Sequence, residues 1–301
     1  MLNFKPTELL TNTYAMKTFL RFFFLLAVSF LLLTSQLSAQ TILVVDRDGS
    51  GYSPDVFSDT WDKVSNSLDA LGYEYDYIEV MTSDTSIGQD LLDVALYDIV
   101  IWLTGETWEN NQTMTPEEEF NLILYQAFGG KLFLNSQDYL YDRYNGYGTF
   151  SDTEFPHSQL GVVEVFQDLL NIEVGEIDSA RFVGSPGSIV EGIEFPVEDI
   201  FTEPTDDGLW VDSIVQHNGQ AMLGILVPYI SPGPFAIQYE TGAFRSVFTT
   251  VDIASIQDTV TREILMDRII YWLMSGLIGV DEISANEVEL VIMPNPVVDL
   301  V

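Results

Sequence analysis

Four acidic side chains each follow a short apolar segment of the kind that forms buried strands. They are Asp46, Asp48, Glu106 and Asp138. If these segments are parallel strands of one open sheet, their carboxyl ends meet at one edge, which is where ligands bind in such sheets. Carboxylate oxygens suit a hard cation such as calcium, which takes about six to eight oxygen ligands. The sequence therefore predicts a calcium site at this edge.

The stretch Asp46-x-Asp48-Gly49-Ser50-Gly51 adds a local pattern to this prediction. It resembles the first half of an EF-hand calcium loop, but the later acids and the closing bidentate Glu of that loop are missing. Asp and Gly directly after a strand are also ordinary turn residues. A solvated turn without a metal is therefore the alternative interpretation.

Aromatic and amide side chains are expected at the same edge and could bind an organic ligand. Trp108 and Tyr139 can stack on a sugar ring, and together with Asn135 and Gln137 they form the candidate ligand-binding set. Aromatic residues near loops also serve local packing, which is the alternative for these residues.

Ser136 is the candidate nucleophile because it lies where the family resemblance described below implies a nucleophile on an elbow after a strand. A nucleophilic serine needs a base within hydrogen-bond reach, and the histidines of the chain are His157 and His217. A strand-to-helix elbow also needs small neighbours, whereas Leu134 and Asp138 stand at those positions. This pattern favours a protein without a catalytic nucleophile.

A secreted hydrolase acting on peptide or polysaccharide is the alternative function. It would use Ser136, or two carboxylates among Asp46, Glu106 and Asp138 held at a defined separation. The sequence has no HExxH, CxxC, P-loop or GxGxxG pattern. Their absence argues against a zinc protease, a redox protein, a nucleotide triphosphatase and a simple dinucleotide enzyme.

Strands and helices that would position these residues alternate along the chain. The expected strands are 41–46, 73–80, 97–103 and 131–135, and the expected helices are 54–71, 91–96 and 115–128. Gly72 is expected to end the first helix, and Thr115 followed by Pro116 is expected to begin the third. Apolar strands separated by helices indicate a parallel sheet covered on both faces. The predicted fold class is therefore α/β, a three-layer sandwich with a mostly parallel central sheet.

Residues 141–250 are less regular and contain short apolar runs between Gly and Pro turns. We expect either an irregular β-rich insertion or an antiparallel extension of the sheet. A last core strand at 246–251 and an amphipathic helix at 262–276 close the predicted domain, which spans 41–279.

The order ILVVD, YDIVIWLTG, GGKLFLNSQD and SVFTTVDI resembles the class I glutamine amidotransferase-like fold, a flavodoxin-like architecture. It is similar more narrowly to the non-catalytic version found in exported bacterial proteins. The family's nucleophile is a Cys, and this chain contains none. The resemblance therefore implies a binding or scaffolding module.

Residues 1–40 are predicted to be an N-terminal extension and a signal peptide. Lys17 and Arg21 precede the largely apolar run 22–33, and the small residues Ser38 and Ala39 follow it. We expect cleavage after Ala39. A spanning helix needs about 20 apolar residues, so we expect no transmembrane anchor after cleavage. The predicted location is secreted or cell-surface, reached through the periplasm and outer membrane.

Residues 280–301 are predicted to be a linker and the start of a truncated domain. Pro294-Asn295-Pro296 follows a short apolar segment and resembles the opening of the C-terminal sorting domain of type IX secretion. The resemblance implies the type IX secretion machinery as a partner. An ordinary proline-rich turn is the alternative.

The chain has 11 Lys and Arg against 46 Asp and Glu, a net charge of −35. Binding to phosphates needs clustered basic residues, so nucleic acid and anionic membrane surfaces are excluded as expected partners. Cations, neutral polysaccharides and surface proteins remain as candidates. The alternative role of the charge is to keep an exported protein soluble.

Overall fold

The structure of the protein is a computed structural model that describes residues 42–51, 59–81, 94–105, 107–108, 113–144, 148–173, 181–196, 208–226 and 233–275. The predicted cleavage site at Ala39, the predicted metal ligand Glu106 and the motif Pro294-Asn295-Pro296 lie outside these residues. Among the residues described, no helix combines the length and apolar character needed to cross a membrane.

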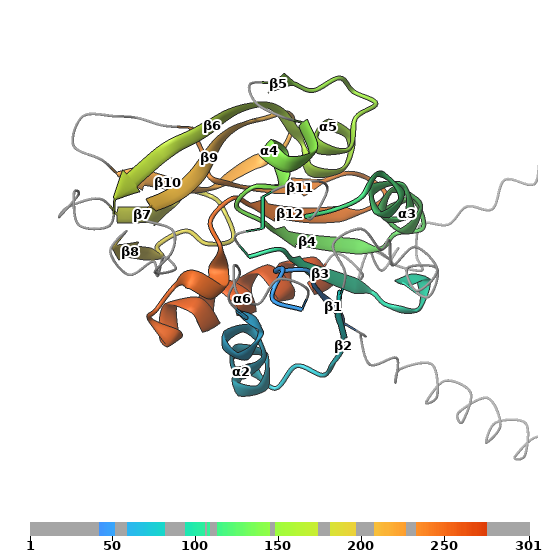
Figure 1. Cartoon of the computed structure of the whole chain (residues 1–301), viewed down its shortest axis with the longest axis horizontal. Helices are drawn as coiled ribbons and strands as arrows, with labels where there is room; N and C mark the ends of the chain where they lie inside the picture. Colours follow the sequence, from blue (N-terminus) through green and yellow to red (C-terminus); the bar gives the residue numbers. More distant parts are fainter. Residues whose placement is uncertain are drawn as a thin grey trace, which may run out of the picture. The chain divides into compact units, whose positions relative to one another are not determined.

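A nine-stranded sheet has the order β2-β1-β3-β4-β12-β11-β10-β7-β8 (Figure 1). Its first five strands pair in parallel. They are β2 (Tyr75–Glu79), β1 (Ile42–Asp46), β3 (Ile99–Leu103), β4 (Lys131–Asn135) and β12 (Arg245–Thr249). All residues of β1, β3 and β4 are buried, because these apolar strands are covered on both faces.

The remaining strands extend the same sheet in antiparallel pairs. They are β11 (Ala236–Glu240), β10 (Gln220–Leu226), β7 (Arg181–Gly184) and β8 (Glu194–Pro196). The predicted three-layer, flavodoxin-like sandwich with a mostly parallel sheet is therefore wrong, since the sheet is mixed, with four parallel and four antiparallel pairs of neighbouring strands. Parallel neighbours need long crossover segments, usually helices. Among the described residues between 181 and 249 there is no such helix, and the strands pair antiparallel instead.

A second sheet of three antiparallel strands packs against one face of the main sheet. Its strands are β5 (Gly148–Thr149), β6 (Val162–Glu173) and β9 (Gly208–Gln216). Val162, Val165 and Ile214 share a core cluster with Ile237 and Phe248 of the main sheet. The sequence analysis did not predict β6, because a register shift between Phe166 and Leu170 interrupts its alternation.

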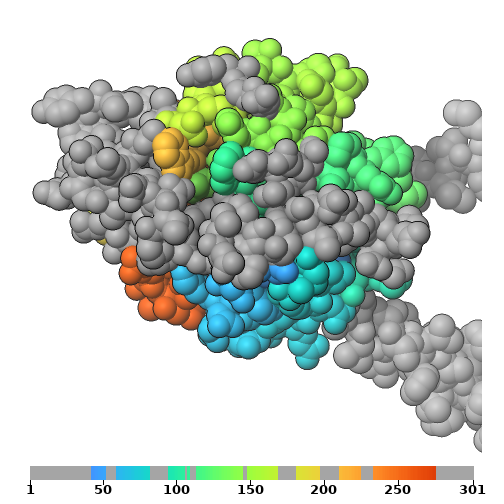
Figure 2. All heavy atoms as spheres, in the orientation of Figure 1, coloured from blue at the N-terminus to red at the C-terminus, as the bar shows by residue number. Residues whose placement is uncertain are grey.

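Helices cover the main sheet on both sides, as Figure 1 shows. On one face lie α2 (Trp61–Leu71) and α6 (Thr259–Ser275), which share a core cluster with Ile42 and Val44 of β1. Figure 2 shows α2 and α6 side by side. On the other face lie α3 (Pro116–Ala127), α4 (Tyr139–Tyr144) and α5 (Phe155–Leu160). Their core cluster contains Leu43 and Val45, the alternate residues of β1.

The first helix is shorter than predicted. It was expected over 54–71, but α2 begins at Trp61, and Thr60 is its N-cap residue. The Asp59 side chain accepts a hydrogen bond from the Trp61 backbone N–H at 2.9 Å, which satisfies a donor at the helix start. Gly72 ends the helix in the left-handed conformation, as the sequence predicts.

Asp212 of β9 is a fully buried carboxylate in the second sheet. Its Oδ1 accepts a hydrogen bond of 3.0 Å from the Asp168 backbone N–H, at the bulge of β6 where Asp168 has a φ of 51°. Burial, helped by the charge of Asp168, raises the pKa of Asp212 to about 8, while that hydrogen bond lowers it in part. The folded protein therefore holds a proton on Asp212 that the unfolded chain releases near pH 4.

This difference makes stability depend on pH. Because the pKa is raised in the folded state, the contribution of Asp212 is present below about pH 4 and is lost as pH rises from there to about 8. We expect Asp212→Asn to flatten the fall of the thermal midpoint between pH 5 and 8, with exposed Asp152→Asn as the control. An unchanged pH profile in Asp212→Asn would contradict the assignment.

Candidate functional site

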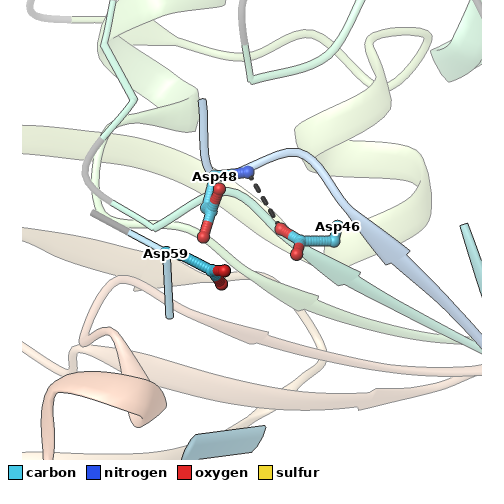
Figure 3. A group of neighbouring side chains, drawn as sticks. All are labelled: Asp46, Asp48 and Asp59. Atoms are coloured by element: carbon cyan, nitrogen blue, oxygen red, sulfur yellow. Dashed lines mark hydrogen bonds between the residues drawn. The ribbon is translucent and has the colours of Figure 1, made fainter. Parts of the chain in front are cut away.

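Three aspartates meet where β1 leaves the main sheet. Asp46 is the last residue of β1, Asp48 follows two residues later, and Asp59 precedes α2. One carboxylate oxygen from each lies within 4.8 Å of the others. Figure 3 shows the three carboxyl groups gathered around a common space. Asp46 and Asp48 are each 2% exposed, whereas Asp59 is exposed, so the group opens to solvent on the Asp59 side.

Hydrogen bonds fix the orientation of Asp48. Its Oδ1 accepts from the Ser50 backbone N–H at 2.9 Å and from the Ser50 hydroxyl at 2.6 Å. Its Oδ2 accepts from the Thr60 backbone N–H at 2.8 Å and from the Thr60 hydroxyl at 3.1 Å. Asp48 thus joins the turn after β1 to the start of α2. The two hydrogen bonds from Thr60 hold the preceding residue, Asp59, at the site.

Asp46 is held by the turn on one side and by β2 on the other. Its Oδ1 accepts the Asp48 backbone N–H at 3.2 Å, the bond drawn in Figure 3, and its Oδ2 accepts the Tyr77 hydroxyl at 2.9 Å. The Tyr77 ring stacks on Trp61 of α2 with centroids 4.1 Å apart. Strand β2 and helix α2 therefore support Asp46 through Tyr77.

Burial and neighbouring charge raise the pKa of Asp46 and of a second buried carboxyl group near the site. Burial, and next the negative charge of Asp48, raises the pKa of Asp46 to about 7. Asp252, which follows β12, is also buried, and burial raises its pKa to about 6. The charge of Asp48 adds to that rise, while Lys63 opposes it. A bound cation would relieve the repulsion that now favours protonation of Asp46.

The arrangement can hold a metal ion. The three ligand groups are carboxylates, which suit hard cations that prefer oxygen. Sequence reasoning identified Asp46 and Asp48 but missed Asp59, because the predicted helix included that residue. The Asp59-Thr60 pair just before an apolar periodic segment was a usable helix-start signal.

The other predicted metal ligands do not join this group. Glu106 lies outside the described residues. Asp138 is buried directly before α4 and is not part of the group. The strand order explains this, because β3 lies between β1 and β4.

The candidate ligand-binding residues occupy very different environments. Trp108 is 45% exposed, whereas Asn135, Gln137 and Tyr139 are buried. The Asn135 side chain donates to the Val251 carbonyl at 2.8 Å and accepts from the Ile253 backbone N–H at 3.1 Å. Other polar contacts are the Tyr139 hydroxyl donating to Glu119 Oε1 at 2.8 Å and the Gln137 amide donating to Asp138 at 3.4 Å. Asn135 and Tyr139 thus use their polar groups within the protein.

Ser136 is fully buried, and its hydroxyl serves the local structure. It accepts hydrogen bonds from the Thr104 hydroxyl at 2.5 Å and from the Tyr139 backbone N–H at 3.0 Å. The two histidines contact each other instead, with ring centroids 4.7 Å apart. The geometry of a serine activated by a hydrogen-bonded histidine is therefore not formed by these residues.

A buried ion pair anchors the turn that carries the aspartates. Arg47, between Asp46 and Asp48, is fully buried, and its Nη1 lies 2.7 Å from Oε1 of Glu118, which is also fully buried. The other oxygen of Glu118 accepts the Thr115 backbone N–H at 2.6 Å and closes a capping box at the start of α3. One carboxylate thus connects α3 to the turn.

No protein-family model matches the sequence, and no curated protein matches it. Solved structures with a similar chain course include a β-galactosidase from Bacillus circulans sp. alkalophilus, at 13% identity and a TM-score of 0.49, covering 78% of this chain and 32% of that chain. A ThuA-like protein from Parabacteroides merdae is 11% identical with a TM-score of 0.45, covering 79% of this chain and 90% of that one. The mmIFT52 N-terminal domain is 14% identical with a TM-score of 0.48, covering 79% of this chain and 98% of that one.

This chain spans about a third of the length of the β-galactosidases that it matches. At these identities and TM-scores, the similarity supports no inference about activity. The resemblance to class I glutamine amidotransferases stays a prediction from the sequence.

Replacing Glu118 tests the anchor. We expect Glu118→Gln to lower the free energy of unfolding by about 3 kcal/mol, because breaking a buried ion pair typically costs about 3–5 kcal/mol and Gln keeps one acceptor oxygen. Glu117→Gln, at the exposed neighbouring position, should change stability by less than about 0.5 kcal/mol. Denaturant unfolding measures both, and equal small effects would show that the pair does not anchor the turn.

Proposed function

We propose that this protein is an exported binding or scaffolding module whose three-aspartate group, Asp46, Asp48 and Asp59, binds calcium. The observation that carries the proposal is the approach of three carboxylate oxygens to within 4.8 Å, two of them on buried side chains. Carboxylates this close repel one another, and the pKa of Asp46 is raised first by its burial and next by the charge of Asp48. A divalent cation neutralises the group more completely than a proton on one carboxyl does.

Calcium fits the group better than the other common divalent ions. Zinc and copper favour nitrogen and sulfur ligands, whereas the three ligand groups offer oxygen alone. Magnesium demands near-ideal octahedral geometry and keeps most of its waters. Calcium accepts irregular oxygen sites, so an exposed Asp59 and solvent can complete its coordination.

The bound ion would stabilise the local structure and, through it, the exposed surface around the site. Asp46 belongs to the sheet, Asp48 to the turn and Asp59 to the start of α2. An ion shared by them would fasten the turn and helix to the sheet edge. An exterior rim stabilised in this way could bind a surface protein or a polysaccharide, the partner classes that the negative charge leaves open.

Export is the second part of the proposal and rests on the sequence. The basic start, the apolar run 22–33 and the small residues at Ser38 and Ala39 support a signal peptide. Pro294-Asn295-Pro296 supports recognition by the type IX secretion machinery. A location outside the cell, where calcium is plentiful, agrees with a weak calcium site of the extracellular kind.

Calcium should stabilise the protein through the three aspartates. At a concentration about 100 times the dissociation constant, a ligand adds about 2.7 kcal/mol, or roughly 5–10 °C in the thermal midpoint. We expect this rise when calcium is added to the chelator-treated full chain, and we expect Asp46→Asn and Asp48→Asn to abolish it.

Two further variants make this test specific. Asp59→Asn replaces an exposed ligand and should weaken calcium binding without disturbing the buried turn. Asp62→Asn, an exposed position one residue into α2, should keep the full response. An equal calcium response in the native chain and in Asp46→Asn would exclude this site, as would a chain whose midpoint ignores calcium.

The secreted protein should begin at Gln40, because cleavage is expected after Ala39. Mass spectrometry of the N-terminal peptide, after expression in a host with type IX secretion, gives the answer. A protein recovered outside the cell with Met1 or Met16 at its start would contradict the predicted cleavage.

A further inference from the structure

The two histidines of the chain come together on a part of the protein separate from the three aspartates. His157 lies in α5, and His217 lies in the turn between β9 and β10, sixty residues later in the sequence. Their rings are 4.7 Å apart between centroids and 32° from parallel. His217 is exposed and His157 is half-buried, so a small solute can reach the pair.

The backbone fixes this approach. The His217 backbone N–H donates to the Gly161 carbonyl at 2.7 Å, and Gly161 is the residue that ends α5. Gly161 has a φ of 71°, and a Cβ there would lie 2.7 Å from the ring of Tyr239 and 3.3 Å from the His217 carbonyl. The helix end and the turn are therefore packed closely, and His157 stands one turn before that junction.

The contact of His217 with Asn218 indicates which ring nitrogen carries the electron pair that a metal ion would have to take over from the Asn218 amide. The Nδ2 of Asn218 lies 2.7 Å from Nε2 of His217. An amide nitrogen can only donate, so Nε2 accepts and the ring proton belongs on Nδ1. A neutral imidazole nitrogen with an available electron pair is the form that binds metal ions. Asn218 occupies the position that a metal ion would take.

We propose that His157 and His217 form a binding site for a divalent transition-metal ion such as zinc. Zinc binds imidazole nitrogen at about 2.0–2.1 Å, so one ion can bridge two rings whose nitrogens are about 3–4 Å apart. An ion about 2.0–2.1 Å from one nitrogen of each ring lies about 3 Å from each ring centroid, so a centroid separation of 4.7 Å is of the size that two imidazoles on one ion require. Water completes the coordination, which makes the site open and of modest affinity. The negative charge of the protein raises the local concentration of cations.

This site differs in chemistry from the three-aspartate group. Calcium prefers oxygen and does not compete for imidazole, whereas zinc, copper and nickel bind imidazole readily. The two proposals can therefore fail independently. Loss of the calcium response in Asp46→Asn leaves the histidine pair intact, and replacement of a histidine leaves the three aspartates intact.

Proton NMR of the untagged full chain tests the pair directly, because its two histidines give only two sets of imidazole C–H signals. In saturating calcium, zinc titration should shift both sets together with one ion per chain. In His217→Ala, the zinc affinity measured from the His157 signals should fall at least tenfold. Asn218→Asp should tighten zinc binding about tenfold by adding a carboxylate ligand, and its φ of 55° is a conformation that Asp tolerates.

Other results would overturn the proposal. If zinc shifts the signals of only one histidine, or of neither at millimolar concentration, the pair is a packing contact and not a metal site. A His157 shift that survives in His217→Ala means that the rings do not share an ion. Disappearance of both shifts in Asp46→Asn would assign zinc to the aspartates instead.

Discussion

The turn after β1 depends on a buried charge pair, and the candidate site depends on that turn. Arg47 reaches into the protein to Glu118, and its backbone N–H donates to the Leu103 carbonyl at 2.8 Å, at the end of β3. The residues on either side, Asp46 and Asp48, are thereby held beside each other at the sheet edge. A buried pair adds little net stability, but removing either partner is costly. Its role here is to fix geometry.

The fixed turn creates an electrostatic cost that the protein itself only partly offsets. The hydroxyls and amides of Ser50, Thr60 and Tyr77 solvate individual oxygens of Asp46 and Asp48. They do not remove the cost of burying Asp46 or the repulsion from Asp48, and these two effects raise the pKa of Asp46 to about 7. Because a proton and a cation would compete for Asp46 near neutral pH, binding of a cation there is expected to depend on both pH and metal concentration.

Local patterns in the sequence were enough to place much of the parallel half of the sheet. The predicted strands 41–46, 97–103 and 131–135 contain β1, β3 and β4, and all residues of these three strands are buried. The capping signals at Thr115 and Gly72 also predicted the start of α3 and the end of α2. The order of the remaining strands depends on which turn-rich segments pair, and some partners, such as β7 and β10, are far apart in the chain. Hydrophobic periodicity carries little information about such pairing.

The same distinction separates the two metal proposals. Asp46 and Asp48 are two residues apart in the chain, so their approach was visible as a motif. Asp59 lies beside them because the next residue, Thr60, donates hydrogen bonds to Asp48. His157 and His217 have no sequence pattern in common. They meet because the second sheet returns β9 to the end of α5, where the Gly161 carbonyl accepts the His217 backbone N–H. A ligand pair of this kind is a product of topology, and only the three-dimensional structure brings it into view.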